Sequence, residues 1–534
     1  MNNFLKQSAI LMVFVFVALA VLWPNSMGNN PDVIVDESYF LTSSLQAIQK
    51  HTLPGWEFSY SGNYYGGPQT YVDFVALIPT LGVVLASQHF SVEATQAWVA
   101  QHTGDLLHVL RTVNGLLTLA LAVFLYFYFA RRRIQKPLAL SLILLGLLIF
   151  SNSLFIGLVH TAKVWVFYML AVALTSALLI AQEYYAASAD EFLSKRTWLG
   201  VLVWSGIVIA FQNYVGAFSI ALIALYALVL GHFSWGDVWG YIKKFWYWFV
   251  VFGALNISFI YRALFINLPE GSFAGIAITN DSGGSDLFLR LYLPLKYVIL
   301  SAPLAVGLYV FGVFLFAWSM RSFTKRQRLW GALACVHPVV TYLFFHALAG
   351  FTVAPRYGIM LGFACALGAA VLVPLVARRA LGGALVLTGA LALVVGVHSI
   401  ALYWQPSTEV VLERTLAGQY NSPKVAFITD PSALRLTLPT NTASLQLLDQ
   451  KRADMSRFQF LLAHPQYAQS TFKPLVATAY TDDELKTLVA RAALSTTHVW
   501  VISSDNASTQ EPTFLATFLG TRQLGSTYTL TRAR

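Results

Sequence analysis

The sequence is built from long apolar runs separated by short polar segments. A run of about 20 apolar residues is long enough to cross a bilayer as a helix. The runs that we interpret as spans cover residues 4–23, 106–130, 137–152, 163–182, 198–211, 214–231, 245–265, 291–319, 329–349, 355–376 and 380–403. The pattern predicts an α-helical polytopic membrane protein with about eleven transmembrane helices.

One further apolar stretch, residues 73–90, does not fit the count as a span. If it crossed the membrane, Arg131–Arg133 would lie on the side opposite to the other basic loops. We therefore interpret it as a juxtamembrane or re-entrant helix, which we expect Pro79 to break.

The basic residues predict the orientation of these spans. Lys and Arg are concentrated in five short segments: 131–136, 194–196, 243–244, 321–328 and 377–379. An even number of predicted spans separates each segment from the next, so all five lie on one side, which the positive-inside rule makes cytoplasmic. The N-terminus is then inside, a first external loop covers 24–105, and the C-terminus is outside. The N-terminus has only Lys6 as a positive region and no clear cleavage site, which favours a retained anchor.

The pattern changes after residue 404. Apolar runs shorten to strand length in KVAFITD, HVWVISS and TYTLTRA, and two amphipathic segments, ADMSRFQFLLAH and DDELKTLVARAAL, intervene. This predicts a small extracytoplasmic α/β domain over 405–534, beside a transmembrane domain over 1–404.

Composition agrees with a membrane protein: 57% of residues are hydrophobic and 11% are charged. The formal charge of +10 does not indicate nucleic-acid binding, because the cations lie in short loops between spans. The two cysteines, Cys335 and Cys365, lie in apolar runs without metal-ligand or disulfide spacing, and packing is their expected role.

The candidate chemistry lies on the predicted outer side. An acidic pair, Asp36-Glu37, follows the first span, where a lipid-linked substrate would present its head group. Such a pair is also typical of a solvated loop. Cations near outer span ends, including Arg111, Lys163 and Arg356, together favour an anionic ligand such as a phosphate, although each one could also snorkel to the interface.

Four segments resemble the GT-C glycosyltransferases, in particular the bacterial branch related to protein O-mannosyltransferases and lipid A aminoarabinose transferases. These segments are VDESYF (35–40), YYGGPQTYVDFVALIPTLG (64–82), LLHVLRTVNGLLTLALAVFLYFYFARRR (106–133) and APRYGIMLGFACALGAAVLVP (354–374). The resemblance covers most of residues 1–400. One departure from the family pattern is Gln69 after Pro68.

The resemblance implies sugar transfer, with inversion, from a polyprenyl-phosphate donor to a glycan, lipid or protein acceptor at the outer face. An acceptor hydroxyl needs a base, and the departing phosphate needs cations. Asp36 is the expected base, and Glu37 orients the acceptor or neighbouring cations. The expected donor-phosphate ligands are Arg356, then Lys163 and Arg111, with His160 as a further donor. The tyrosines expected to line the sugar site are Tyr39, Tyr64, Tyr65 and Tyr357. No cofactor is assigned, and a divalent metal is left open.

Two other classes of function are compatible with the sequence. A transporter or flippase of a lipid-linked or anionic substrate would also place cations at outer span ends, although the sequence lacks the duplicated halves typical of transporters. A membrane scaffold without enzymatic activity is the third alternative. The sugar and the acceptor are not predicted.

Overall fold

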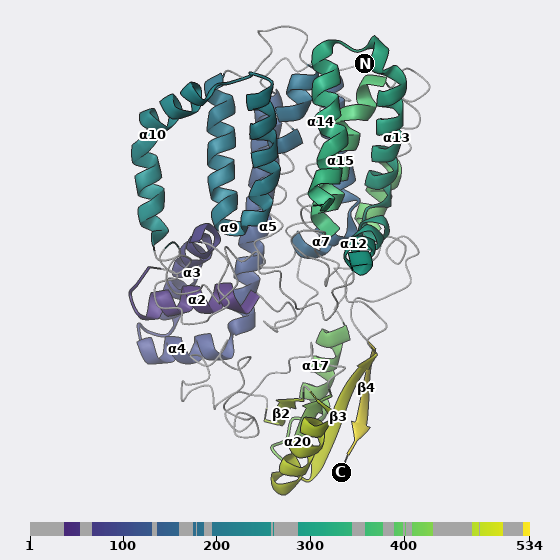
Figure 1. Ribbon diagram of the computed structural model, residues 1–534. Helices are drawn as coiled ribbons and strands as arrows, with labels where there is room; N and C mark the ends of the chain where they lie inside the picture. The colour runs from purple at the N-terminus through teal and green to yellow at the C-terminus, as the bar shows by residue number, and fades with distance from the viewer. Residues whose placement is uncertain are drawn as a thin grey trace.

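The fold is a helical bundle with a small sheet at one end (Figure 1). The computed structural model describes residues 37–53, 67–130, 136–159, 175–177, 179–185, 195–257, 260, 287–343, 358–376, 389–398, 401, 408–430, 473–479, 481–505 and 527–533. The first half of the chain forms helices α2 (Glu37–Gln49), α3 (Gly67–Ser87), α4 (Val92–Gln101), α5 (Thr103–Ala130), α6 (Lys136–Phe150), α7 (Ser153–Val159), α9 (Lys195–Val229) and α10 (Trp235–Leu255). The second half adds α12 (Leu287–Ser301), α13 (Pro303–Ser319), α14 (Lys325–Tyr342), α15 (Gly358–Val376), α17 (Thr408–Gln419) and α20 (Asp482–Ser495).

Helix α9 contains two crossings of the bundle. A straight helix of 35 residues would be about 52 Å long. Yet the ring of Trp198, at its start, lies 4.8 Å from the ring of His232, just past its end. Halfway along, a Cβ at Gly206 would lie 3.5 Å from Ile220 Cγ2. The chain therefore reverses between these residues, which agrees with the two predicted spans 198–211 and 214–231.

The described basic segments lie together at one end of the bundle, at the top of Figure 1. The Arg196 guanidinium lies 5.2 Å from the ring of Phe245 in α10. The ring of Trp198 in α9 lies 5.8 Å from that of Trp330 in α14. Below, this end is called the basic end. Lys243 and Lys244 were predicted to lie in a loop, but they belong to α10. This helix bends at Phe245, where a span was predicted to start.

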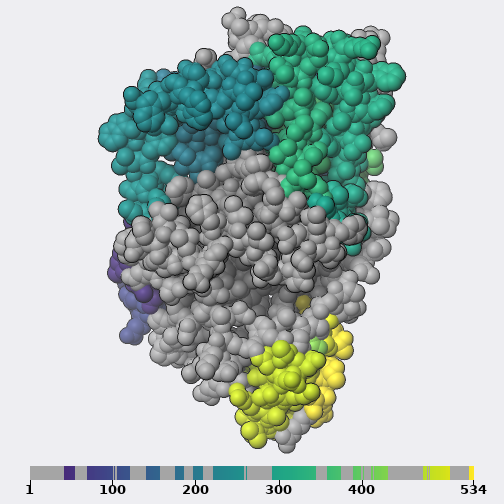
Figure 2. All heavy atoms as spheres, viewed as in Figure 1, coloured from purple at the N-terminus to yellow at the C-terminus, as the bar shows by residue number. Residues whose placement is uncertain are grey.

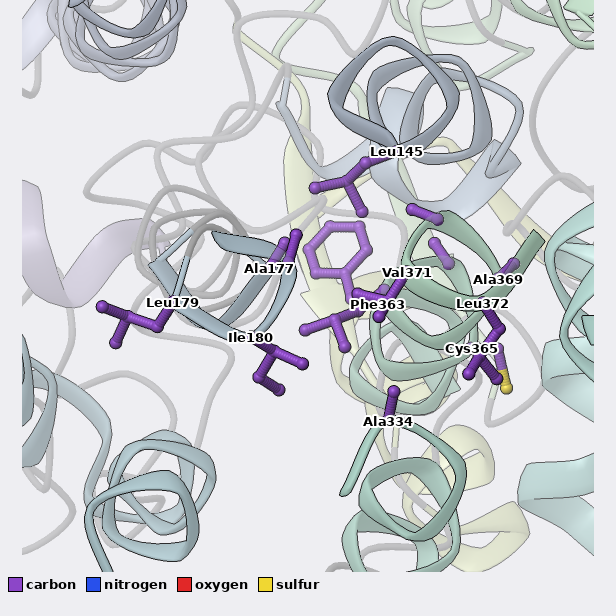
Figure 3. Close-up of a cluster of buried hydrophobic side chains, with 14 of the residues drawn as sticks. Leu145, Ala177, Leu179, Ile180, Ala334, Phe363, Cys365, Ala369, Val371 and Leu372 are labelled. Atoms are coloured by element: carbon purple, nitrogen blue, oxygen red, sulfur yellow. The ribbon is translucent and has the colours of Figure 1, made fainter. Parts of the chain in front are cut away.

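Helix α15 lies at the centre of the bundle and packs against α6, α12, α13 and α14. All of its residues from Gly358 to Pro374 are buried. Figure 3 shows Leu145 of α6, together with Ala177 and Ile180, around Phe363 and Val371 of α15. Its small residues allow this packing, because a Cβ at Gly368 would lie only 2.6 Å from Tyr309 Cδ2.

Tyrosine hydroxyls join neighbouring helices at several places. Each donates a hydrogen bond to a backbone carbonyl of another helical segment. The pairs are Tyr71 to Leu255, Tyr185 to Val371, Tyr226 to Leu329, Tyr309 to Cys335 and Tyr342 to Leu291. Bonds of this kind hold helices together where apolar surroundings give little preference for one packing over another.

Helices α2, α3 and α4 gather at the opposite end, where α2 and α4 run across the direction of the bundle (Figure 1). Gln69 near the start of α3 bonds to Asn114 of α5, whereas Leu77 shares an apolar cluster with Leu106 and Leu107. The two helices are thus antiparallel, and α3 extends past the start of α5. Because Gln69–Ser87 is long and apolar enough to cross a membrane, the juxtamembrane interpretation of α3 stays a prediction.

Two details of the predicted helices are wrong. Pro79 does not break α3, which continues to Ser87. Proline removes one backbone hydrogen bond but leaves the others of the helix intact. The predicted single span 291–319 is divided at Ala302 (φ −139°, ψ 50°) into α12 and α13, because Pro303 is favoured at the first position of a new helix.

Membrane-crossing length is met by two of the helices that the structure describes, Gln69–Ser87 and Pro303–Ser322. Shorter apolar helices cover Leu140–Phe150, Ile220–Val229, Leu291–Ser301, Gly358–Pro374 and Gly389–His398. These helices do not establish the predicted count of eleven spans, which stays a prediction.

The C-terminal residues form a four-stranded sheet of order β2-β1-β3-β4. Strands β1 (Val425–Thr429), β2 (Leu475–Thr478) and β3 (His498–Asp505) are parallel, and β4 (Thr527–Arg532) is antiparallel to β3. Apolar residues of α20 pack on one side of the sheet and those of α17 on the other. The three predicted strands and the helix of α20 are confirmed, β2 and α17 were not predicted, and the segment ADMSRFQFLLAH lies outside the described residues. Figure 2 shows α20 and β4 at the end opposite α14.

The predicted orientation is testable by cysteine labelling of Lys325, at the basic end, and Lys486, exposed on α20. In a Cys335→Ala/Cys365→Ala background, Lys325→Cys should be protected from a membrane-impermeant maleimide in spheroplasts, because the basic end faces the cytoplasm. Lys486→Cys should react. After detergent lysis both should react, and the inverse pattern in spheroplasts would reverse the orientation.

Candidate functional site

Three of the predicted site residues fall on described elements. Glu37 is the first residue of α2 and Tyr39 lies in its first turn, each with only its backbone described. Arg111 lies in α5 with its side chain described. The others lie outside the described residues: Asp36, Tyr64, Tyr65, His160, Lys163, Arg356 and Tyr357.

An apolar seam holds α2 against α3 and α5. Leu41 and Leu45 are one helical turn apart on α2, so they share a face of that helix. They pack in one cluster with Leu77 of α3 and with Leu106, Leu107 and Leu110 of α5. The start of α2, directly after Asp36, is thereby fixed against the first turns of α5.

A buried polar cluster lies beside this seam. The side-chain amide nitrogen of Gln69, Nε2, donates to Asp73 Oδ1 at 2.7 Å and to Asn114 Oδ1 at 2.9 Å. All three side chains are buried, and Asp73 is 0% exposed. Ser44 of α2 reaches the same neighbourhood, since its hydroxyl lies 3.5 Å from the carbonyl oxygen of Thr70. We call Gln69, Asp73, Arg111 and Asn114 the α3–α5 polar cluster.

Arg111 joins this cluster through its position on α5. It precedes Asn114 by three residues, which puts both on the same face of the helix. The residue is only 4% exposed. A guanidinium keeps its charge under all ordinary conditions, and a buried charge is costly without an anionic or hydrogen-bonding partner. The site therefore contains a fixed positive charge close to the start of α2.

Asp73 contributes an acidic group that sequence reasoning missed. One carboxylate oxygen, Oδ2, has no hydrogen-bond partner among the residues that the structure describes. Leaving such a buried atom unsatisfied costs about 1–3 kcal/mol. An acidic residue inside an apolar helix is a functional signal in itself, and this signal could have identified Asp73. Asn114 gave no signal, because its role depends on a contact 45 residues away in sequence.

A second charged group lies at the basic end. Glu183 is fully buried and forms an ion pair with Arg326, whose Nε also donates to the Glu183 carbonyl oxygen at 2.9 Å. His232 Nε2 lies 3.7 Å from Glu183 Oε1. The rings of Trp198 and Trp330 lie within 7 Å of the His232 ring, at 4.8 and 6.5 Å. This group joins three segments of the bundle and lies at the end opposite the α3–α5 polar cluster (Figure 1).

Within the described ranges, no group of three or more His, Cys, Asp or Glu side chains could hold a metal ion. Cys335 and Cys365 are free thiols.

Comparisons with known proteins give two weak structural matches. No family model and no curated protein sequence matches the chain. ArnT from Cupriavidus metallidurans bound to undecaprenyl phosphate is similar in structure, with a TM-score of 0.44 and 11% identity over 95% of this chain and 94% of that one. The apo state of the same protein gives a TM-score of 0.40 and 13% identity over 94% and 92% of the chains. Scores below 0.5 are too low to assign the fold or the activity.

The contribution of the α3–α5 polar cluster to stability can be measured with Gln69→Leu. This change removes the donor to Asp73 and leaves a carboxylate buried without its hydrogen bond. We expect a loss of about 1–3 kcal/mol in the free energy of unfolding, measured by denaturant titration in mixed micelles.

Two further variants make that measurement specific. Gln419→Leu changes an exposed glutamine on α17 and should have little effect. Adding Asp73→Leu to Gln69→Leu should recover part of the loss, because both polar partners are then gone. Equal stability of the wild type and Gln69→Leu would show that the hydrogen bond contributes nothing measurable.

Proposed function

We propose that the chain is a membrane glycosyltransferase of the GT-C type, which moves a sugar from a polyprenyl-phosphate carrier to an acceptor at the outer face. The acceptor is a hydroxyl of a cell-envelope glycan, a lipid or a protein. Residues 1–404 form the transmembrane catalytic domain, and residues 405–534 form an α/β domain on the extracytoplasmic side.

The observation that carries this proposal is the placement of α2. This helix begins directly after Asp36 and packs against α3 and α5 at the end opposite the basic end. Arg111 is buried at the same junction. With the basic end in the cytoplasm, the start of α2 and a buried cation share the outer side, where we assign the acidic pair its role. A base and an anion-binding group are the two requirements of transfer from a lipid phosphate.

The reaction follows from these roles. An acceptor oxygen attacks the anomeric carbon from the face opposite the phosphate, which inverts that carbon. A new carbon–oxygen bond forms as the bond between the sugar and the phosphate oxygen breaks. Asp36 accepts the acceptor's proton, and the electron pair of the broken bond leaves with the phosphate. Glu37 orients the acceptor or the neighbouring cations.

The cations stabilise the leaving phosphate. Arg356 is assigned as its principal ligand, because a guanidinium binds two phosphate oxygens at once. Arg111, Lys163 and His160 are the supporting donors. Burial of Arg111 in the α3–α5 polar cluster supports its role, since a guanidinium in a low-dielectric site attracts an anion strongly. The tyrosines at 39, 64, 65 and 357 are assigned to the sugar site.

The base is tested with Asp36→Asn, which keeps the size of the side chain but cannot accept a proton. Turnover should fall about 10²–10⁴-fold, the usual contribution of a positioned base. The assay follows radiolabelled sugar from a polyprenyl-phosphate donor in membranes at matched protein levels. Asp105→Asn, which changes an exposed carboxylate in the first turn of α5, should keep near-normal turnover. Normal turnover in Asp36→Asn would contradict the assignment of Asp36 as the base. Translocation of the donor by the wild type without sugar transfer would favour a flippase.

The phosphate ligand is tested with Arg356→Lys, which keeps the positive charge but loses the planar pair of donors. The apparent affinity for the donor should weaken about ten-fold or more, which corresponds to one charge-assisted hydrogen bond of about 1.5–3 kcal/mol. The apparent affinity for the acceptor should change less. A variant that affects only the acceptor would move Arg356 to the acceptor site and leave Arg111 and Lys163 as donor ligands.

A further inference from the structure

Helix α10 has two parts that differ in direction. The first part, Trp235 to Lys244, starts at Ser234, whose hydroxyl and backbone form a capping box with Asp237. The second part follows the bend at Phe245, which has non-helical dihedral angles (φ −116°, ψ 17°). Figure 1 shows the first part sloping across the basic end and the second part running along the bundle. The bend therefore separates a segment at the end of the bundle from one along its side.

No residue of α10 is buried. Its outward side chains are large and apolar or aromatic, including Trp235 and Trp239, which are 74% and 58% exposed. Figure 2 shows this helix on the outer surface of the molecule. In membrane proteins, tryptophans are enriched at the membrane–water interface, where the lipid head groups lie.

Cations accompany these aromatic rings. The Lys243 ammonium lies 5.6 Å from the centre of the Trp239 ring, and the Arg196 guanidinium lies 5.2 Å from that of Phe245. Lys244 is adjacent in sequence, and the side chains of all three cations are exposed. We call Arg196, Trp235, Trp239, Lys243, Lys244 and Phe245 the α9–α10 corner.

The charge of the corner is not balanced within its own two helices. Between Lys195 and Ile257 the only carboxylate is that of Asp237. Its Oδ2 accepts hydrogen bonds from the backbone nitrogen and the hydroxyl of Ser234, at 2.8 and 2.9 Å. This carboxylate takes part in the helix cap, and its single negative charge stands against the three positive charges of the corner.

We propose that the α9–α10 corner binds the phosphate head group of an anionic membrane lipid. The cations contact the phosphate, and the two tryptophans fix the first part of α10 at the level of the head groups. Basic side chains beside a bilayer attract anionic lipids. Aromatic rings hold a segment at the membrane–water interface and so determine how deep the site lies in the membrane. The proposal depends on the chain being embedded in a membrane, but it does not depend on the glycosyltransferase activity.

The test uses the full-length protein in neutral detergent, titrated with dioleoyl phosphatidylglycerol or dioleoyl phosphatidylcholine. Native mass spectrometry gives the bound fraction at each lipid concentration. The wild type should bind phosphatidylglycerol more tightly than phosphatidylcholine. Lys243→Gln/Lys244→Gln should weaken phosphatidylglycerol binding about 25-fold, at about five-fold for each charge removed. It should leave phosphatidylcholine binding unchanged.

The matched control is Lys424→Gln/Lys473→Gln, which removes the same charge from exposed positions beside the C-terminal sheet. This control should bind phosphatidylglycerol like the wild type. Lys243→Arg/Lys244→Arg, which keeps the charge, should retain binding and guards against a folding defect in the glutamine variant. Equal binding of both lipids by the wild type, or an equal loss in the control, would overturn the proposal. So would displacement of phosphatidylglycerol by an equal concentration of inorganic phosphate, which would indicate a site for free anions.

Discussion

The arrangement of the bundle depends on a buried ion pair. Glu183 has no solvent exposure, and Arg326 contacts both its carboxylate and its backbone carbonyl. An unpaired charge buried at that depth would cost several kcal/mol. Separating the two segments that carry the pair would therefore be unfavourable by a similar free energy. His232 brings the end of α9 to the same carboxylate. Three segments that are far apart in sequence are thereby held together at the basic end.

Much of the fold could be predicted from the hydropathy pattern, because segments in lipid must be apolar and long, whereas strands and helices in water alternate apolar and polar residues. The paired crossings in α9 and the strands β1, β3 and β4 agree with the sequence pattern, and α10 bends at Phe245, where a span was predicted to start. The break at Ala302 was missed because apolar character continues through it without change. Strand β2 has only four residues, and α17 has weak amphipathic character, so neither gives a strong periodic signal.

The candidate site was predicted less completely, for a related reason. Sequence motifs predicted that Arg111 lies on the outer side, and the structure shows that it is buried on α5, a helix that packs against α2. Gln69 was recognised only as a departure from a family pattern. Its function as a bridge between Asp73 and Asn114 depends on helix pairing that no local pattern encodes. Motifs show which groups are available, whereas tertiary contacts decide which of them share one environment.

The central position of α15 limits how its sequence can diverge. A methyl group at Gly362 would lie 2.8 Å from Asn152 Nδ2, and one at Gly368 would overlap Tyr309, whose hydroxyl is bonded to Cys335. Side-chain volume, more than polarity, therefore limits substitution at these two glycines. Glycine is the residue that fits both positions, because even a methyl group would require the neighbouring atoms to shift. The segment that contains Arg356 joins this closely packed helix at Gly358.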